Sequence, residues 1–460
     1  MSGIVVIGTG PAGHRLVTRL RRHDGTAAVR VIGAERRPAY NRVLLTDVLA
    51  GRLRPGQLEL PAHDGGVRVH QGVTALGIDR RGRLVHTDDG RAHGYDRLVL
   101  ATGARPVLPV LRGLLRPDGG MAEGAAAVRT LADAARLPGE GPAVVLGGGV
   151  LGVETALALR RSGRAVVLVH RNRRLMNRQL DDRSADLLAG QVRSEGVVVE
   201  CGRRVRAFAP GRVLLDDGRT VPCAALLVCA GVRPVTGLAR TAGLAVRRGV
   251  VVDGLLRTSD PRIHAIGDCA EYDGTVAGRV TAAWDQADTL AALLTGGTGH
   301  YRGTPPATRL RGPRPELAVI GRPDASGAET VLLSDSERYA RLVLDAGGRL
   351  LGGILFGLPE AAAAAAAAGQ HYAHGLPLPP ARLAFLLGTR PVRTAPARPA
   401  DDLVVCHCNI VTRGQLAAAW RSGSTSAAQL VAATRATTGC GGCLAEITEF
   451  SRELAGDGAA

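Results

Sequence analysis

The opening of the chain alternates apolar and polar segments in a regular way. Ile4 to Ile7 is an uninterrupted apolar run, which is typical of a strand buried in a parallel sheet. A glycine-rich turn, Gly8 to Gly13, follows it, and residues 14–22 then have a helical pattern. A second apolar strand, residues 29–34, ends at Glu35. Strand, glycine turn, helix, strand and terminal acid in this order predict a dinucleotide-binding unit.

The turn itself reads Gly-Thr-Gly-Pro-Ala-Gly, which is the GxGxxG fingerprint. Its first glycine allows the tight turn, its second leaves room for a pyrophosphate, and its third lets the helix pack on the strand. The pyrophosphate is expected at the helix N-terminus, because the free N–H groups there favour anions. A carboxylate at the end of the second strand can accept both ribose hydroxyls. We therefore predict that the adenosine half of a flavin contacts Gly8, Gly10, Pro11, Ala12, Gly13 and Glu35.

A second unit of the same kind begins with the apolar run Ala143 to Leu146. The glycines that follow predict a second dinucleotide, NADH or NADPH. The next strand, residues 164–169, ends at His170 instead of an acid. A carboxylate there favours NADH, whereas the neighbouring arginines favour the 2′-phosphate of NADPH; the abundance of arginine leaves both open. The predicted contacts are Gly147, Gly149, Val150, Leu151, Gly152, Glu154, His170 and Arg171.

Other segments predict the rest of the flavin site. The alternation over residues 72–91 indicates a small antiparallel meander, and the strand 95–100 runs into Thr102 and Gly103. A buried strand from Ile263 ends in Gly267 and Asp268, whose carboxylate can hydrogen-bond a ribitol chain. Trp284 opens the next predicted helix, whose positive end can face the flavin, although an ordinary core role for this tryptophan is equally compatible.

Residues 301–387 have strand patterns but no evident catalytic or binding residues. Strands are predicted at residues 318–321, 330–333, 339–344 and 350–355, followed by an Ala-rich helix over 361–368. This composition is typical of a packing or interface domain. Residues 388–402 are rich in proline and indicate a stiff linker and a domain boundary.

The tail concentrates four of the eight cysteines. Cys406 and Cys408 form a Cys-x-Cys pair, and Cys440 and Cys443 form a Cys-x-x-Cys pair. Four thiolates from two short loops can hold a [2Fe–2S] cluster or zinc. The Cys-x-Cys half and the adjacent glycines favour the cluster. The other four cysteines are interpreted as core residues: Cys201, Cys223, Cys229 and Cys269.

The length and charge of the chain bear on its number of domains, its partners and its localisation. A chain of 460 residues is expected to form three or four domains. The formal net charge is +17 and the chain has no lysine, but no dense basic block with interleaved aromatic residues is present. We therefore expect no nucleic-acid partner and attribute the charge to compositional bias. No 18-residue apolar run occurs and the first strand begins at Ile4, so we expect a cytoplasmic protein without a signal peptide or membrane span.

Together these features resemble the two-dinucleotide flavoproteins, and in particular the FAD-containing subunits of bacterial assimilatory nitrate and nitrite reductases. The stretches Arg37 to Val43 and Leu175 to Asp181 look like signatures of that group. The tail resembles bacterioferritin-associated-ferredoxin-type (BFD-like) domains. The resemblance implies a [2Fe–2S] cluster on the four tail cysteines. It also implies FAD contacts at Gly8, Gly10, Gly13, Glu35, Arg42, Thr102, Gly103 and Asp268.

The expected fold is α/β, with two Rossmann-like domains, an α+β interface domain and a small helical cysteine-rich domain. We expect the FAD domain to be discontinuous, and the linker to precede the cluster domain. The expected limits are 1–115 with 240–300 for FAD, 116–239 for NAD(P)H, 301–387 for the interface domain, 388–402 for the linker and 403–460 for the [2Fe–2S] domain.

The resemblance implies an NAD(P)H-oxidising flavoprotein that passes electrons through FAD and the cluster to a separate terminal reductase. Large nitrite reductase subunits of this group continue into a sirohaem module, whereas this sequence ends seventeen residues after Cys443. The expected partner is a molybdenum nitrate reductase, with a sirohaem nitrite reductase as the alternative. A stand-alone ferredoxin or rubredoxin reductase and a reductase with a zinc docking tail also stay open. The loop after Glu35 lacks a cysteine pair, which argues against disulfide reduction. No catalytic side chain is predicted, because hydride chemistry belongs to the cofactors.

Overall fold

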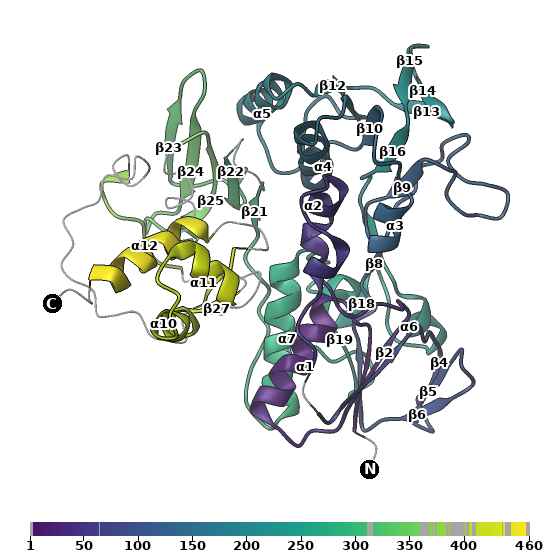
Figure 1. Cartoon of the computed structure of the whole chain (residues 1–460). Coiled ribbons are helices and arrows are strands. Elements are labelled where there is room, and N and C mark those ends of the chain that lie inside the picture. Colours follow the sequence, from purple (N-terminus) through teal and green to yellow (C-terminus); the bar gives the residue numbers. More distant parts are fainter. Residues whose placement is uncertain are drawn as a thin grey trace.

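A computed structural model defines the architecture (Figure 1). It describes residues 3–63, 65–310, 316–358, 368–369, 371–372, 375–382, 386, 401, 404–406, 411–434, 436–437 and 443–456. Within these ranges the chain forms two parallel sheets flanked by helices, an antiparallel sheet and a small helical tail. The α/β fold class predicted from the sequence is confirmed.

The first parallel sheet has the strand order β19-β7-β1-β2-β3. Apolar side chains of β1 and of helix α1 are fully buried in its core, among them Val5, Val6 and Leu16. Helix α7 packs against α1, so the last strand and last helix of this unit come from a distant part of the chain. The bounds are β1 Ile4–Ile7, α1 Pro11–His23, β2 Val29–Gly33, β3 Val67–Gln71, β7 Arg97–Leu100, β19 Ile263–Ala265 and α7 Val280–Leu294.

The second parallel sheet, β12-β11-β10-β16-β9, repeats this plan. In each sheet the strand before the glycine turn, β1 or β10, lies in the centre, between one strand that follows it closely and one that returns from further along the chain. Such a reversal of strand order is where open α/β sheets bind ligands. The bounds are β9 Ala125–Ala127, α3 Leu131–Ala135, β10 Ala143–Leu146, α4 Val150–Arg161, β11 Val166–His170, α5 Asp182–Ser194, β12 Val198–Cys201 and β16 Ala225–Val228.

Short elements connect and decorate the two sheets. The predicted meander is present as β4-β5-β6, and a second antiparallel hairpin unit is β13-β14-β15. Their bounds, with those of the connecting elements, are η1 Arg42–Leu44, α2 Leu45–Leu49, η2 Pro55–Leu58, β4 Ala75–Asp79, β5 Leu84–Thr87, β6 Ala92–Gly94, β8 Ala104–Pro106, β13 Val205–Ala209, β14 Gly211–Leu215, β15 Thr220–Cys223, β17 Val232–Pro234, α6 Gly237–Thr241, β18 Val250–Val252, η3 Gly267–Cys269 and β20 Ala270–Tyr272.

The region predicted as an interface domain forms an antiparallel sheet of order β21-β22-β25-β24-β23. The four predicted strands are present, and the sequence pattern missed only the short edge strand β21 among the described strands of this sheet. Residues 361–367 of the predicted Ala-rich helix lie outside the described residues, and so does the predicted linker 388–402 except for residue 401. The bounds are β21 Ala307–Arg309, β22 Leu317–Gly321, β23 Glu329–Ser334, β24 Tyr339–Leu344 and β25 Leu350–Phe356.

One predicted boundary is wrong in a way that affects the site. Helix α7 begins at Val280, so Trp284 lies in its second turn and does not open it. The reason is Gly278, whose φ of 59° ends the preceding loop and places the helix start two residues later. The positive end of the helix therefore lies before Trp284.

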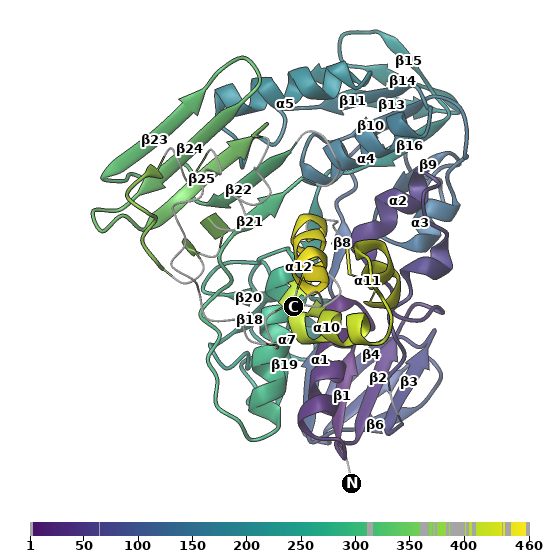
Figure 2. The ribbon, with the colours of Figure 1, turned by 60° about the vertical axis from the view of Figure 1, so that its left-hand side comes forward.

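The tail folds around a small core of its own. Cys406, Leu416, Leu430, Cys443 and Ile447 are buried together in it. Two views place its helices α10 and α11 beside α1 and α7 of the first α/β unit (Figures 1 and 2). The bounds are β26 Val404–Cys406, β27 Val411–Thr412, α10 Arg413–Arg421, α11 Ala427–Thr434 and α12 Leu444–Gly456.

Candidate cofactor sites

The first glycine turn has the shape of a pyrophosphate cradle. Gly8 has a φ of +124°, and a Cβ added there would lie 2.1 Å from the carbonyl oxygen of Ala101. A Cβ on Gly13 would lie 2.1 Å from the carbonyl oxygen of Gly8. A Cβ on Gly10, by contrast, would meet only Arg42 Nε, at 3.9 Å. Two crowded glycines thus shape the turn, while the middle one leaves open space at the N-terminus of α1, which fits a pyrophosphate.

The second turn repeats this geometry. Gly147 has a φ of +123°, and a Cβ on Gly152 would lie 1.7 Å from the carbonyl oxygen of Gly147. A Cβ on Gly149 would have no neighbour within 4 Å. Val150 and Leu151 form the first turn of α4, with Glu154 one turn further on. The residues present therefore fit a second dinucleotide, as predicted from the glycine spacing.

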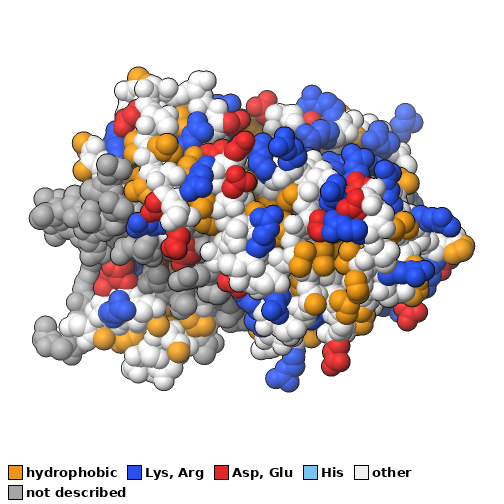
Figure 3. All heavy atoms as spheres, turned by 90° about the horizontal axis from the view of Figure 1, so that it is seen from above, with side chains coloured by type: hydrophobic (Ala, Val, Ile, Leu, Met, Phe, Trp, Pro, Cys, Tyr) orange, Lys and Arg blue, Asp and Glu red, His pale blue; other side chains and the backbone are white. Residues whose placement is uncertain are grey.

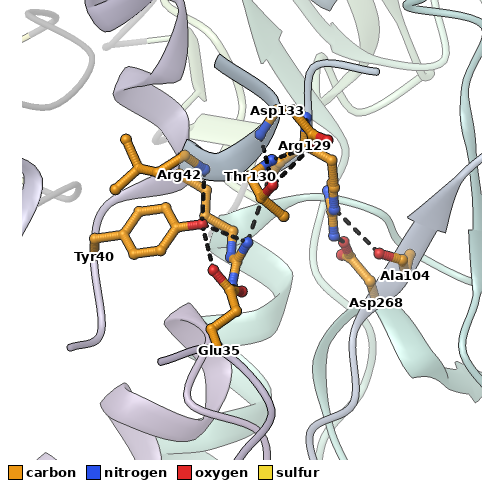
Figure 4. A network of polar contacts seen from close by, with 9 residues as sticks. Glu35, Tyr40, Arg42, Ala104, Arg129, Thr130, Asp133 and Asp268 are labelled. Carbon is orange, nitrogen blue, oxygen red and sulfur yellow. Dashed lines mark hydrogen bonds and ion pairs between the residues drawn. The ribbon is translucent and has the colours of Figure 1, made fainter. Parts of the chain in front are cut away.

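At the acidic end of the first site, Glu35 is held in a network (Figure 4). Its carboxylate forms an ion pair with Arg42 and accepts a hydrogen bond of 2.8 Å from the Tyr40 hydroxyl. Arg42 also donates to Tyr40 Oη at 3.0 Å and to the carbonyl oxygen of Arg129 at 3.3 Å. Burial, with a smaller contribution from the hydrogen bond to Glu35, raises the pKa of Tyr40 to about 12. Glu35 and Arg42, predicted to contact ribose and phosphate, thus bind each other here, and their cofactor contacts stay predictions.

The carboxyl ends of β1, β7 and β19 bring the remaining predicted flavin residues to one edge. Leu100 pairs with Ile7 on one side and with Ala265 on the other, so the turns after these strands adjoin. The Thr102 hydroxyl donates to the carbonyl oxygen of Val235 at 2.8 Å. The residues gathered at this edge are Gly8, Thr102, Gly103, Gly267 and Asp268.

Arg129 is a site residue that sequence reasoning missed. It follows β9 in the second α/β unit and donates from Nη2 to Asp268 Oδ2 at 2.7 Å and from Nε to the carbonyl oxygen of Ala104 at 3.1 Å (Figure 4). Its guanidinium therefore joins the second unit to the carboxylate predicted to hold the ribitol. No local signal marks it: the capping box of Thr130 and Asp133 locates the start of α3 but does not indicate the pairing of Arg129 with Asp268.

At the adenosine end of the second site, His170 is buried at the end of β11, whereas Arg171 and Arg173 are exposed. Burial lowers the pKa of His170 below its ordinary value. In the described part of the chain no ion pair involves either arginine, so both guanidinium groups are available to an incoming phosphate.

A cavity of about 650 Å³ lies between the first α/β unit and the tail. One wall comes from α1, the loop before β3 and α7, with His14 and Trp284, and the other from Gln415, Ala419 and Thr434 of the tail helices. Trp284 is half-buried on this wall, with the guanidinium of Arg15 5.5 Å from the centre of its ring. Trp284 is thus neither an ordinary core aromatic nor at the helix end, and it faces the gap between the two modules.

The tail brings two of the four predicted ligands together. Cys406 at the end of β26 and Cys443 directly before α12 are 1% and 9% exposed and belong to one core. Cys408 and Cys440 lie outside the described residues, and among the described residues no group of three or more metal-binding side chains occurs. Two buried thiols from two segments agree with a four-cysteine site. Of the other cysteines, Cys223 and Cys269 are core residues as expected, whereas Cys201 and Cys229 are only partly buried.

Arginine covers much of the face above the second sheet (Figure 3). Several arginines of the second α/β unit are paired with acids: Arg219 lies 2.8 Å from both Glu200 and Asp217, and Arg203 lies 3.2 Å from Asp217. Such pairs make the surface less uniformly basic than the net charge indicates. In the part of the chain that the structure describes, no helix combines the length and the apolar character that crossing a bilayer requires.

Two glycine cradles on successive parallel sheets define an oxidoreductase that uses FAD and NAD(P)H. The chain belongs to the pyridine nucleotide-disulphide oxidoreductase family, which matches residues 2–287. Residues 404–450 match the BFD-like [2Fe-2S] binding domain. These matches confirm the FAD, NAD(P)H and [2Fe–2S] cofactors predicted from the sequence, and with them NAD(P)H-linked electron transfer.

Two named relatives align with nearly the whole chain. The chain is 32% identical over 473 residues to the nitrite reductase [NAD(P)H] large subunit of Klebsiella oxytoca, covering 97% of this chain and 48% of that one. It is 29% identical over 475 residues to the assimilatory nitrate reductase electron transfer subunit of Bacillus subtilis, and the alignment covers 98% of this chain and 59% of that one. The chain thus spans about half the length of these curated relatives. A covalent putidaredoxin reductase–putidaredoxin complex matches with a TM-score of 0.73 at 26% identity, covering 83% of this chain and 95% of that chain.

Proposed function

We propose that this chain is the NAD(P)H-oxidising electron-transfer subunit of an assimilatory nitrate reductase. In this proposal the tail hands electrons to a separate molybdenum-containing enzyme in the cytoplasm. We keep the domain limits and the site residues inferred from the sequence as part of the proposal. FAD and NAD(P)H, when bound in the two cradles, would supply hydride transfer and one-electron release, and the side chains of this chain would bind and orient them.

The observation that carries this proposal is the position of the tail. Helices α10 and α11 form one wall of the cavity whose other wall is α1, the helix that begins at the first glycine cradle, together with Trp284 of α7. A tail used only for docking elsewhere has no need to lie beside the flavin unit. The nitrate reductase subunit of Bacillus subtilis, matched over 98% of this chain, supports the choice of partner.

A second candidate function is reduction of a small external iron–sulfur protein. The similarity to the putidaredoxin reductase complex, which covers 95% of that chain, favours it. In that case the FAD, NAD(P)H and interface domains would suffice, and electron delivery would not require the tail.

The test is reconstitution under anaerobic conditions. The purified chain, with about two irons per chain as a [2Fe–2S] site requires, is mixed with NADPH or NADH and a molybdenum nitrate reductase, and nitrite formation is measured. Parallel reactions replace the partner with a sirohaem nitrite reductase or a small ferredoxin. Nitrite formation that requires this chain is the expected result. Rapid reduction of ferredoxin with no response to nitrate reductase would favour the second candidate, and a colourless tail with stoichiometric zinc would exclude the cluster route.

Replacing Arg171 by alanine is expected to raise KM for NADPH about tenfold and to leave KM for NADH nearly unchanged. The reason is that an exposed guanidinium after β11 can pair with a 2′-phosphate, which NADH lacks. Steady-state kinetics with ferricyanide as acceptor measures both constants. Arg22→Ala is the matched control, because Arg22 is an exposed arginine on α1, outside this site. Equal changes for the two nucleotides would remove Arg171 from the recognition of the phosphate.

A further inference from the structure

We infer that His170 is a positioning residue for the nicotinamide dinucleotide: its imidazole acts as a hydrogen-bond acceptor that holds the second glycine cradle through the backbone of Gly148. This inference rests on the proposed dinucleotide site. It gives His170 a role in shaping the site, beyond the fact that it replaces the acid expected at the end of β11. The histidine stands where an acidic residue would contact ribose, yet its ring faces the protein and not the ligand.

The geometry begins with the backbone of Gly148, in the middle of the cradle. Its N–H donates to His170 Nδ1 at 3.1 Å, and its carbonyl oxygen accepts from the N–H of Met176 at 2.7 Å. A Cβ on Gly148 would lie 2.7 Å from both the His170 ring and the Leu175 side chain. Both polar groups of this peptide are therefore used by the segment that follows β11, and the contact is too close for any residue other than glycine.

The bond to Gly148 fixes the protonation of the ring. Because Nδ1 accepts a hydrogen bond, the proton of the neutral ring is on Nε2, which lies 3.3 Å from Asn177 Oδ1 and donates to it. The same amide oxygen accepts from Asn172 Nδ2 at 2.9 Å. His170 thus has no lone pair left for a ribose hydroxyl. This end of the site offers donors and no imidazole acceptor, in agreement with recognition of a phosphate by Arg171.

The segment from Leu175 to Asp181 holds this arrangement in place from outside. Met176 is buried and has a φ of +46°, a left-handed conformation that turns its N–H toward Gly148. At the far end, Asp181 caps α5 and accepts a hydrogen bond of 2.5 Å from the hydroxyl of Tyr339 on β24. The cradle is therefore connected through His170 and Met176 to a segment that the antiparallel sheet anchors.

The surroundings keep the ring neutral. Burial, with a smaller contribution from Arg171, lowers the pKa of His170 from its ordinary value of 6.5, against smaller opposing contributions from Asn177 and the backbone of Arg174. On the neighbouring strand, Cys201 pairs with His170, and burial raises the pKa of its thiol, so it is neutral as well. Arg203 follows that strand and donates its backbone N–H to the His170 carbonyl oxygen. Protonation of Nδ1 would replace an acceptor by a donor facing Gly148, so dinucleotide affinity should be constant above pH 6.5 and fall as pH drops through the lowered pKa.

Two substitutions separate this role from simple packing. In His170→Asn the amide oxygen can take the place of Nδ1, whereas in His170→Gln the amide reaches the position of Nε2 and leaves Gly148 N–H without its acceptor. Calorimetric titration of the FAD-loaded chain with NADP⁺, which binds without turnover, measures affinity directly. We expect His170→Asn to stay within about threefold of the natural chain and His170→Gln to bind roughly tenfold more weakly, since an orphaned buried donor is costly.

The pH profile provides a second, independent measurement. Measured with NAD⁺, which lacks the 2′-phosphate that itself titrates at about pH 6, the natural chain should lose affinity only below pH 6.5. His170→Asn should lack that loss because its amide does not titrate. Equal weakening in both variants, equal affinity in both, or the same pH profile in His170→Asn as in the natural chain would each overturn the role of His170. If the natural chain binds neither NADP⁺ nor NAD⁺, the dinucleotide site itself is wrong. Flavin absorbance and thermal unfolding report whether each variant is folded.

Discussion

Gly13→Ala is expected to yield a folded chain that has lost most of its FAD. The new methyl group would lie 2.1 Å from the carbonyl oxygen of Gly8, a backbone atom that cannot move aside without opening the cradle. Overpacking of this kind costs about 1–3 kcal/mol, which is a loss in affinity of roughly 5- to 150-fold. The measurement is flavin absorbance per chain after gel filtration, followed by titration of the apoprotein with FAD.

The matched control is Gly25→Ala, just after the same helix. A Cβ on Gly25 has no neighbour within 4 Å and its φ is not left-handed, so FAD content should stay unchanged. A full complement of FAD in Gly13→Ala would mean that the cradle can open at no cost, and the assignment of this turn to the pyrophosphate would fail. Loss of FAD in both variants would indicate a general weakness of α1.

The two cradles could be predicted from the sequence because their determinants are local. In each, a strand of four apolar residues, three glycines at fixed spacing and a helix start are consecutive in the chain. The structure adds that Gly8 and Gly147 have nearly the same φ, 124° and 123°, so that the two turns repeat one conformation. Four of the five described strands of the antiparallel sheet could also be predicted, because each contains a local apolar run, whereas the short edge strand β21 has none.

Arg129 and the role of His170 could not be predicted, because both depend on partners far away in the sequence. Arg129 meets Asp268, 139 residues later, and its own neighbours give no hint of that pairing. His170 was predicted as a ligand contact from its place after a strand, but the direction of its ring depends on how Gly148 and Asn177 pack around it. Among so many arginines, composition alone cannot single out a functional one.

The start of α7 illustrates the same limit at short range. The sequence pattern places the helix start at Trp284, whereas the helix begins four residues earlier, at Val280, shortly after Gly278. The four-residue shift moves Trp284 from the helix end to the wall of the cavity shared with the tail. An aromatic side chain at that place lies between the flavin unit and the module that carries the cysteines, which gives the electron-transfer proposal its structural basis.

Cys443→Ser is expected to abolish electron delivery to nitrate reductase while NAD(P)H-dependent reduction of ferricyanide continues. Cys443 is buried in the core of the tail together with Cys406, and its loss removes one of four proposed thiolate ligands. Substituting residues that only hydrogen-bond to metal ligands already lowers metal affinity or activity roughly 10- to 100-fold. Loss of a ligand itself should lower both by more. Ferricyanide, a small acceptor, can take electrons directly from the flavin unit, whose core does not include the tail.

The decisive comparison uses iron content and both activities, with Cys223→Ser as the control. Cys223 is a buried cysteine at the end of β15, outside the tail, so its substitution should leave the iron content and the reduction of both electron acceptors unaffected. If Cys443→Ser loses both activities, the tail supports the fold of the flavin unit and is not the exit for electrons. If it keeps both activities and its iron, Cys443 is not a ligand. Selective loss of iron and of nitrate reduction is the outcome that a buried thiol in a separate small core predicts, because damage there stays local.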